Sequence, residues 1–435
     1  MSGGDAGPLP PLRLPRALLD PRLALPGAAD DGLVTVQLEQ RGGLLTAIRP
    51  LVGHAAAAPA PLALTPLVEP HTHLDKAFTA NAWPNLAGTM DGAMAANRLE
   101  AAARSGAAVG DRAGAALERA WRYGLRAIRS HIDSLGPWST PSWEVLDALR
   151  RQWAGRVELQ LVALVPLAHW LTPEAEALAE RVALAGGLLG GVLGDPFPPS
   201  PLDGEALLAL LRLAERFGCG VDLHIDESAG GGGRGVALVS RLLLEHRIDV
   251  PLTCSHATSM ALLADRACRR LAERMAAAGL AVVALPATNL WLLDRQQGRT
   301  PRLRPQAPVR QLQEAGVTVA IGGDNVQDPW FPGGDVDPVA LLRFAAITSH
   351  VVPWERQGLA PFSAAAARLL GLDWDGVLRI GGPADLIVLG AGSWSELLAR
   401  SPQRRVLRSG RWLPPCPLEV PSPLLAPLAA APLPG

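Results

Sequence analysis

The chain has 435 residues with 40 basic and 41 acidic groups, which gives a formal net charge of -1. This balance offers no basic surface for nucleic acid. The sequence contains no run of about 18 apolar residues free of charges and helix breakers, so it predicts no membrane span. Four widely spaced cysteines without a CxxC pair indicate neither a disulfide framework nor a thiolate zinc site. We therefore expect a cytoplasmic protein that binds neither nucleic acid nor a membrane.

The two ends of the chain share one sequence pattern. Residues 1–64 carry short apolar runs broken by Gly-Gly and Pro, and residues 373–412 repeat that pattern. Both stretches predict small antiparallel strands, and because they bracket the rest of the chain we expect them to pair as one composite β-sandwich. Residues 413–435 are rich in proline and predict an extended tail.

Between these flanks, residues 65–372 alternate β-type runs with amphipathic helical runs. The eight β-type runs are 65–73, 124–133, 157–165, 187–194, 218–226, 250–255, 279–286 and 317–323. Eight strands with helices between them predict an α/β fold, a closed parallel (β/α)₈ TIM barrel. A doubly wound open sheet is the alternative, and it is disfavoured because no GxGxxG follows the first run.

Histidines mark the ends of several runs. His71 and His73 end the first run, and residues two apart on a strand point to the same face. An HxH pair alone is a weak signal for a metal, but His131, His224 and His256 also fall at the ends of runs. The carboxyl ends of barrel strands build active sites, so five of the nine histidines on one rim predict a functional centre there.

The residues at these strand ends suit a single metal ion. His71, His73 and His224 supply three nitrogens, and Asp324 at the end of the eighth run supplies a carboxylate oxygen. This set leaves room for water on one divalent ion per chain, Zn²⁺ or Fe²⁺, and the sequence does not decide between them. The fourth run, 187–194, contains no lysine that could be carbamylated to bridge two metals.

Other polar residues near these ends predict catalytic and substrate-binding roles. Glu227 is expected to carry protons between water and a leaving nitrogen, and His256 to hold the water or the developing oxyanion, with Asp324 as a third catalytic group. Lys76 is the one lysine among 40 basic residues, which leaves 39 arginines, and we expect it to hydrogen-bond the substrate. Further candidates for substrate contact are His131, His169, Asn325 and Trp330. For His131, His169 and Trp330 a plain structural role is the alternative.

The motifs that carry these residues resemble the amidohydrolase superfamily, specifically its cytosine-deaminase-like branch. They are PHTHLDKAFT (70–79), HIDS (131–134), DLHIDES (222–228), CSHATSM (254–260), GGDNVQDPW (322–330) and GGPADLIVLG (381–390). The resemblance covers nearly the whole chain except the tail. It implies a (β/α)₈ barrel, a sandwich from both termini, and hydrolysis of C–N bonds on nitrogen heterocycles.

The chain also departs from that branch. It lacks the glutamine that cytosine deaminases place after the third strand, and it has Asn325 where they have a carboxylate. A lysine at position 76 is similar to what members like N-isopropylammelide amidohydrolase have. Cytosine itself is therefore a poor candidate, and a different pyrimidine- or triazine-like cyclic amidine is expected.

These observations together predict a mononuclear metal hydrolase that attacks a C–N bond of a small nitrogen heterocycle with metal-bound hydroxide. Two alternatives stay open: a ring-opening hydrolase of cyclic amides on the same site, and a barrel that binds metal or ligand without catalysis. The sequence leaves the oligomeric state open as well, with a homo-oligomer among the alternatives.

Overall fold

A computed structural model describes residues 7–25, 28–53, 59–355 and 357–416. The chain divides into two compact units, each of which is described by itself below. The first unit comprises Met1–Pro66, Arg119–Gly124 and Gly376–Gly435, and the second Leu67–Glu118 and Leu125–Asp375. The domain limits expected after residues 64, 372 and 412 stay predictions. Residues 417–435 of the expected proline-rich tail lie outside the described part.

The second unit is built on parallel strands. The structure describes residues 67–324 throughout, and each of the eight β-type runs coincides with one strand to within a few residues at either end. These strands are β6 (Leu67–Thr72), β7 (Leu125–Asp133), β8 (Glu158–Leu164), β9 (Leu189–Leu193), β10 (Val221–Ile225), β11 (Leu252–His256), β12 (Ala281–Ala284) and β13 (Thr318–Ile321). All residues of β6, β10 and β11 are buried, as expected for strands covered on both faces.

The order of the strands closes on itself. Hydrogen bonds join them into two sheets, β6-β7-β8 and β9-β10-β11-β12-β13. A parallel bridge between Val162 and Leu188 links the β8 and β9 edges, and another between Thr72 and Asp324 links the β6 and β13 edges. The strands therefore follow one another around a (β/α)₈ barrel, which confirms the predicted fold class.

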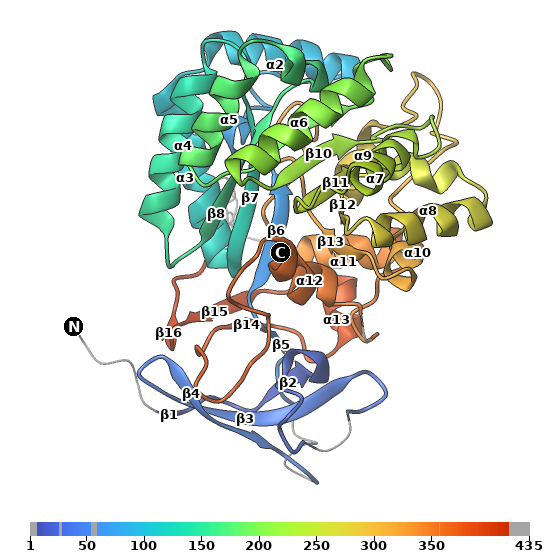
Figure 1. The fold of residues 1–435 in the computed structure, drawn as a ribbon. Coiled ribbons are helices and arrows are strands. Elements are labelled where there is room, and N and C mark those ends of the chain that lie inside the picture. Colours follow the sequence, from blue (N-terminus) through green and yellow to red (C-terminus); the bar gives the residue numbers. More distant parts are fainter. Residues whose placement is uncertain (1–6, 26–27, 54–58, 356, 417–435) are drawn as a thin grey trace, which may run out of the picture. The chain divides into compact units, whose positions relative to one another are not determined.

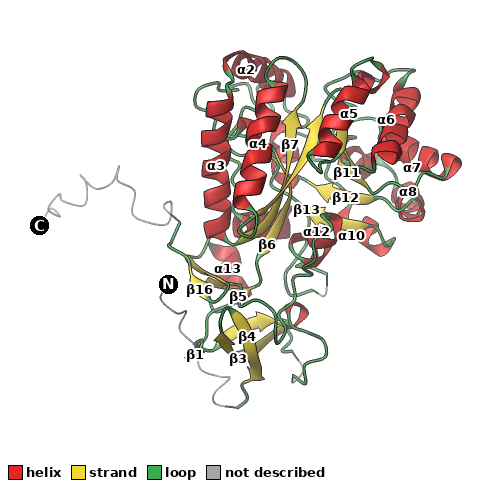
Figure 2. Ribbon diagram, turned by 60° about the vertical axis from the view of Figure 1, so that its left-hand side comes forward, coloured by secondary structure: helices red, strands yellow, loops and turns green. Residues whose placement is uncertain are grey.

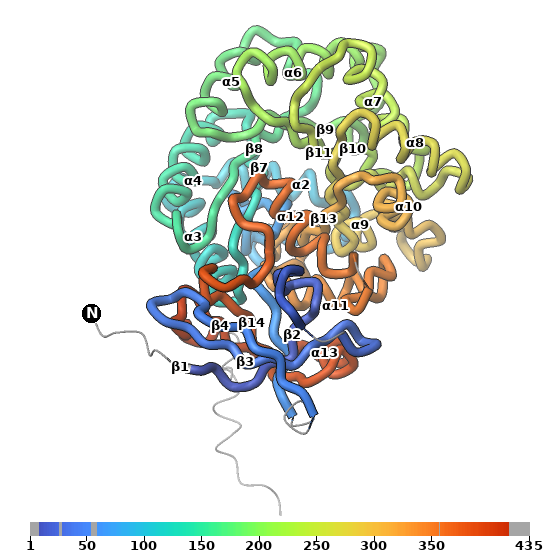
Figure 3. Tube along the Cα trace, turned by 60° about the horizontal axis from the view of Figure 1, so that its bottom comes forward, coloured from blue at the N-terminus to red at the C-terminus, as the bar shows by residue number. Residues whose placement is uncertain are grey.

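Helices surround these strands on the outside. Figure 3 shows α3 to α8 and then α10 following one another around the strands, and Figure 1 shows α3, α4 and α6 outside them. None of the described helices is long and apolar enough to span a bilayer. The α-helices of this unit are α2 (Met90–Ala103), α3 (Gly106–Tyr123), α4 (Ser139–Trp153), α5 (Ala175–Leu184), α6 (Asp203–Phe217), α7 (Arg234–His246), α8 (Asp265–Ala277), α9 (Pro286–Leu292), α10 (Val309–Glu314), α11 (Pro338–Thr348) and α12 (Ala364–Leu369). The short 3₁₀ helices are η2 (Leu74–Lys76), η3 (Leu167–Leu171), η4 (Thr258–Leu262) and η5 (Ala360–Phe362).

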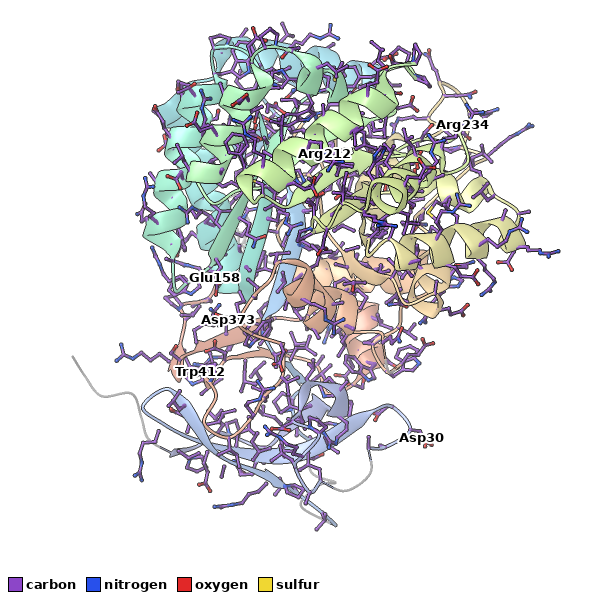
Figure 4. The ribbon with its side chains drawn as sticks, viewed as in Figure 1. Asp30, Glu158, Arg212, Arg234, Asp373 and Trp412 are labelled. Carbon is purple, nitrogen blue, oxygen red and sulfur yellow. The ribbon has the colours of Figure 1, made fainter. Side chains whose placement is uncertain are left out.

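Helix α6 illustrates why the sequence forms these elements. Asp203 and Glu205 lie in its first turn, where carboxylates interact favourably with the helix dipole. Gly218 ends the helix in the left-handed conformation at φ 66°. Leu207 and Leu211 lie on one buried stripe, whereas Arg212 is exposed, as is Arg234 at the start of α7 (Figure 4).

The first unit contains two antiparallel sheets. One holds β1 (Gly7–Pro8), β2 (Leu12–Pro15), β3 (Leu33–Arg41) and β4 (Leu44–Pro50), and the other has the order β16-β15-β14-β5. The members of the second sheet are β5 (Ala63–Leu64), β14 (Leu386–Leu389), β15 (Arg404–Arg408) and β16 (Arg411–Trp412). This unit also holds η1 (Arg16–Leu18) and α13 (Trp394–Ala399), and Figure 2 shows its strands and helices by colour.

The two sheets of this unit share one core. Leu14, Val36 and Leu38 from the first sheet pack in the same cluster of buried side chains as Leu386 and Leu407 from the second. The β5–β14 ladder pairs Leu64 with Ile387, so segments from both ends of the chain build one sheet. This arrangement is the composite β-sandwich predicted from the flanks.

Candidate active site

Five histidines from four strands meet inside the barrel. His71 and His73 come from the end of β6 and the residue after it, His131 from β7, His224 from β10 and His256 from β11. Each side chain belongs to a residue that is at most 7% exposed. The ring of His71 lies 3.9 Å from that of His131 and 4.6 Å from that of His224, measured between centroids. The structure therefore brings together the five histidines that the sequence places at strand ends.

Four of the predicted residues form a compact set of donors, which we call the His–Asp cluster: His71, His73, His224 and Asp324. The Nε2 atoms of His73 and His224 lie 3.3 Å apart. The Oδ1 atom of Asp324 lies 3.2 Å from His73 Nε2 and 3.5 Å from His71 Nε2. Ligands held about 2.0–2.1 Å from one tetrahedral ion are separated by about 3.3 Å, so these spacings fit a single divalent metal.

The protonation of the cluster also fits a metal. Burial, together with the neighbouring imidazoles, holds the pKa values of His71 and His224 well below the usual value for histidine. Metal ligands must be neutral imidazoles, and these histidines are neutral at physiological pH. His71 Nε2 is buried without a hydrogen-bond partner among the described residues. A bound ion would satisfy this atom, whose burial is otherwise unfavourable.

A strained turn after β13 holds Asp324 in the cluster. Asp324 has φ 69°, which is unusual for a residue other than glycine, and its N–H donates to His71 O at 2.9 Å. The buried carboxyl of Glu69 accepts the N–H of Gly323 at 2.9 Å. A Cβ on Gly322 would lie only 2.7 Å from Glu69 Oε1, which explains why a glycine begins the turn.

Glu227, His256 and Asn289 form the next layer. Asn289 Nδ2 donates to Glu227 Oε1 at 3.2 Å and to His256 Nδ1 at 2.9 Å. Because His256 Nδ1 accepts this bond, the ring proton lies on Nε2, which has no partner among the described residues. Burial lowers the pKa of His256 to about 4 and raises that of Glu227 well above the usual range. One amide therefore fixes both predicted proton-handling residues.

A cavity of about 400 Å³ opens over this layer. His73, His224, Glu227, His256 and Asp324 all line it. Its remaining wall is largely apolar. The apolar and aromatic lining residues are Met94, Ala101, Leu135, Trp138, Leu164, Val165, Pro166, Val192, Pro196, Phe197 and Trp330. Trp330, one of the predicted substrate contacts, therefore lies in the cavity wall.

Lys76 also lines the cavity, but it is not a free cation. It is 2% exposed, and its Nζ donates to Asp133 Oδ1 at 2.7 Å. Arg104 donates to Asp75 and Asp133 at 3.1 Å each, and further pairs extend the network to Glu100. Three cations (Lys76, Arg104, Arg112) balance three carboxylates (Asp75, Glu100, Asp133). The positive charge of Lys76, which we expected to face the substrate, is therefore balanced by carboxylates of the protein.

The remaining candidates for substrate contact differ in their position relative to the cavity. His169, on η3, is not among the residues that line the cavity, and its ring contacts Trp170 at 5.6 Å between centroids. His131 is fully buried behind the cavity wall, against His71. Asn325 lines the cavity, but its Oδ1 accepts from Thr288 and its Nδ2 donates to Asp328, both at 2.9 Å. Substrate contact by His169, His131 and Asn325 stays a prediction, and the side-chain amide of Asn325 already makes two hydrogen bonds within the protein.

Replacing Lys76 by methionine is expected to lower the thermal midpoint of the metal-free protein by several degrees. The change leaves one carboxylate of the buried network unbalanced, and breaking a buried ion pair costs about 3 kcal/mol or more. Arg212→Met, which breaks an exposed pair with Glu215, is the matched control and should have little effect. Equal midpoints for the two variants, measured by circular dichroism, would show that Lys76 is not needed for the network.

A parallel barrel with histidines and an aspartate converging at its strand ends defines the architecture of a metal-dependent hydrolase. The Amidohydrolase family model matches residues 98–412, so this chain belongs to the amidohydrolase family. That family is metal-dependent, and its members hydrolyse C–N bonds other than peptide bonds. The family assignment confirms the resemblance drawn from the motifs.

Individual relatives agree with this assignment. The chain is 34% identical over 398 residues to a pterin deaminase of Rhizobium rhizogenes, covering 88% of this chain and 89% of that protein. It is 28% identical to N-isopropylammelide isopropylaminohydrolase of Burkholderia multivorans, with a TM-score of 0.71 over 92% of this chain and 97% of that one. The 5-methylcytosine deaminase of Klebsiella pneumoniae is 24% identical and shares the fold, with a TM-score of 0.77 over 93% of this chain and 96% of that one.

Sequence reasoning missed several residues of this site. Asn289 follows β12 closely, and its position after the seventh strand was the available signal. Asp222 and Ser255 lie inside the motifs that were singled out for His224, Glu227 and His256. Arg104 and Glu100 carry no local signal, because they reach the site from α2 and the residue after it.

Proposed function

We propose that this protein is a hydrolytic deaminase of a pterin-like heterocycle. Water adds to the ring carbon that bears the amino group, the C–NH₂ bond breaks, and the products are a ring carbonyl and ammonia. The observation that carries the proposal is the layer of Glu227, Asn289 and His256, which lies beside the His–Asp cluster in one cavity. The 34% identity to a pterin deaminase supports the choice of ring.

The His–Asp cluster would hold one divalent ion, zinc or ferrous iron. The donors would be the Nε2 atoms of the three histidines and a carboxylate oxygen of Asp324, whose mutual spacings suit such an ion. When bound, the ion would lower the pKa of a water molecule from about 16 towards about 7, which provides a nucleophile at neutral pH. The residues proposed to hold the ion all lie within 65–372, the range expected from the sequence to form the barrel.

Glu227 would transfer the protons of the reaction. Its Oε1 accepts a hydrogen bond from Asn289, and burial and the neighbouring Asp324 raise its pKa well above the usual range, which favours uptake of a proton from water. It would move one proton from water to a ring nitrogen and a second to the leaving amine. Without this transfer the amine would have to leave as an amide anion, which is a poor leaving group.

His256 would stabilise the developing negative charge. Asn289 fixes its tautomer, so that the Nε2–H is the free donor. A fixed donor in a buried site stabilises an oxyanion without reorganisation during the reaction. A neutral ring suits this role, because the proton then stays on His256 throughout.

The cavity supports a flat bicyclic substrate. Its volume of about 400 Å³ lies towards the small end of the 300–1,000 Å³ range of ligand sites. Trp138, Phe197 and Trp330 provide flat aromatic surfaces against which a heterocycle can stack, and Met94 adds apolar contact. The neutral network around Lys76 offers polar groups to the ring without requiring a charged substrate.

A substrate panel tests the proposed function. We expect metal-loaded protein to release ammonia from pterin with a higher kcat/KM than it releases ammonia from cytosine or isopropylamine from N-isopropylammelide. A product with an opened ring would instead establish the cyclic-amide alternative. Absence of turnover on the whole panel by protein that holds its metal would indicate a binding barrel without catalysis.

A further inference from the structure

A chain of buried polar side chains leads into the His–Asp cluster from the interior of the barrel. Arg129 Nη1 donates to Asp222 Oδ2 at 2.8 Å. Asp222 Oδ1 lies 2.8 Å from Ser255 Oγ, and Ser255 Oγ lies 2.9 Å from His71 Nδ1. Arg129 is 2% exposed and the other three residues are fully buried. Bulk solvent therefore does not reach these hydrogen bonds.

The direction of each hydrogen bond follows from the groups involved. A guanidinium only donates, and a carboxylate paired with it only accepts, so the hydroxyl of Ser255 donates to Asp222. The oxygen of Ser255 is then an acceptor towards His71, whose Nδ1 must carry the proton. The lone pair of His71 is thereby left on Nε2, the atom that faces Asp324 at 3.5 Å.

We infer that Asp222 and Ser255 are positioning residues that set the tautomer of His71 for metal binding. The inference rests on the proposed function, in which His71 is a ligand through Nε2. Residues behind a histidine ligand commonly fix its tautomer, and their loss weakens metal binding by about 10–100-fold. Here the carboxylate acts through a hydroxyl, so Ser255 is required for Asp222 to have its effect.

Asp222 itself is a poor candidate for a ligand. It lies within reach of His71 and His131, and these three residues could hold an ion by spacing alone. However, Arg129 occupies Oδ2 and Ser255 occupies Oδ1. A cation placed against this carboxylate would also be repelled by the guanidinium. The positioning role therefore accounts for Asp222 better than direct coordination does.

The substitution Asp222→Asn should reverse the direction of the hydrogen bonds that run from His71 through Ser255 to residue 222. Arg129 holds the amide oxygen of the new side chain, so its NH₂ group faces Ser255 and donates to Oγ. The hydroxyl of Ser255 must then donate to His71 Nδ1, which moves the ring proton to Nε2. A protonated Nε2 cannot bind a metal, so a nearly isosteric change should weaken binding strongly.

Zinc affinity of the full-length protein, measured by competition with a fluorescent chelator and without substrate, tests this inference. We expect Ser255→Ala to bind zinc about 10–100-fold more weakly than the wild type, and Asp222→Asn at least as weakly. The double variant should match Ser255→Ala within about twofold, because without the hydroxyl the amide cannot act on His71. Ser240→Ala, a buried serine that donates within α7, is the control and should leave the affinity unchanged.

Two results would overturn the inference: wild-type zinc affinity in Ser255→Ala, or a double variant weakened by the product of the single effects. The second result would mean that Asp222 acts without Ser255. If Asp222→Asn does not fold because Arg129 is left unpaired, Ser255→Ala, which keeps that pair, decides alone. Failure of the wild type itself to bind zinc would overturn the proposed metal site along with this inference. Zinc binding by the wild type with unchanged affinity in Ser255→Ala would overturn only the positioning role of Asp222 and Ser255.

Discussion

Replacing Glu227 by glutamine is expected to lower kcat by roughly 10²-fold or more. The amide keeps the shape of the side chain and its contact with Asn289, but it cannot carry a proton from water to the ring. Because Glu227 is not one of the proposed ligands, the metal content should not change. Steady-state kinetics of ammonia release, together with elemental analysis of the same sample, measure both quantities.

A matched control separates this effect from general damage. Glu215→Gln changes an exposed carboxylate on α6 that pairs with Arg212, and its kcat should equal that of the wild type. If Glu227→Gln retained near-normal kcat, another group would carry the proton. Asp195, which lines the same cavity, would be the next residue to examine.

Replacing His224 by alanine is expected to remove most of the bound metal and with it all measurable turnover. The change deletes one of three imidazole donors of the His–Asp cluster, the one whose Nε2 lies 3.3 Å from that of His73, and the remaining donors would hold the ion more weakly. His246→Ala, at the exposed end of α7, should keep both metal and activity. Elemental analysis after dialysis gives the metal content of each variant.

The same measurement on His256→Ala distinguishes two sets of ligands. The spacing of the side chains allows an ion with His71, His73 and His224, and also one with His71, His256 and Asp324. We expect His256→Ala to keep its metal and lose turnover, because His256 is held by Asn289 as a hydrogen-bond donor. Loss of metal from His256→Ala with retention in His224→Ala would reverse this assignment.

The barrel could be predicted because its signals are local. A strand covered on both faces reads as a short apolar run, and a histidine at the end of such a run must lie on the rim where all the strands end. His71 and His224 are far apart in the chain, yet the register of a parallel barrel brings them together. The composite sandwich was likewise visible as a shared sequence pattern at both ends, although the pairing of β5 with β14 was not.

The contacts between side chains could not be predicted in the same way. Lys76 was noticed for its rarity, but its partner Asp133 also pairs with Arg104, which follows α2. No local pattern in the sequence shows that these cations share three buried carboxylates. His169 follows β8 on η3, and the contact of its ring with Trp170 could not be read from the spacing of residues. Loop conformation decides such cases, and it depends on tertiary packing rather than on the spacing of residues.

The most direct test of the account is the fate of oxygen and nitrogen when metal-loaded protein acts on pterin in water enriched in heavy oxygen. We expect the heavy isotope in the ring carbonyl of an intact bicyclic product, with ammonia released in equal amount. Both signals should vanish in protein stripped of metal and return when zinc or ferrous iron is restored. Ammonia release by the stripped protein, or heavy oxygen in a ring-opened carboxylate, would contradict the account.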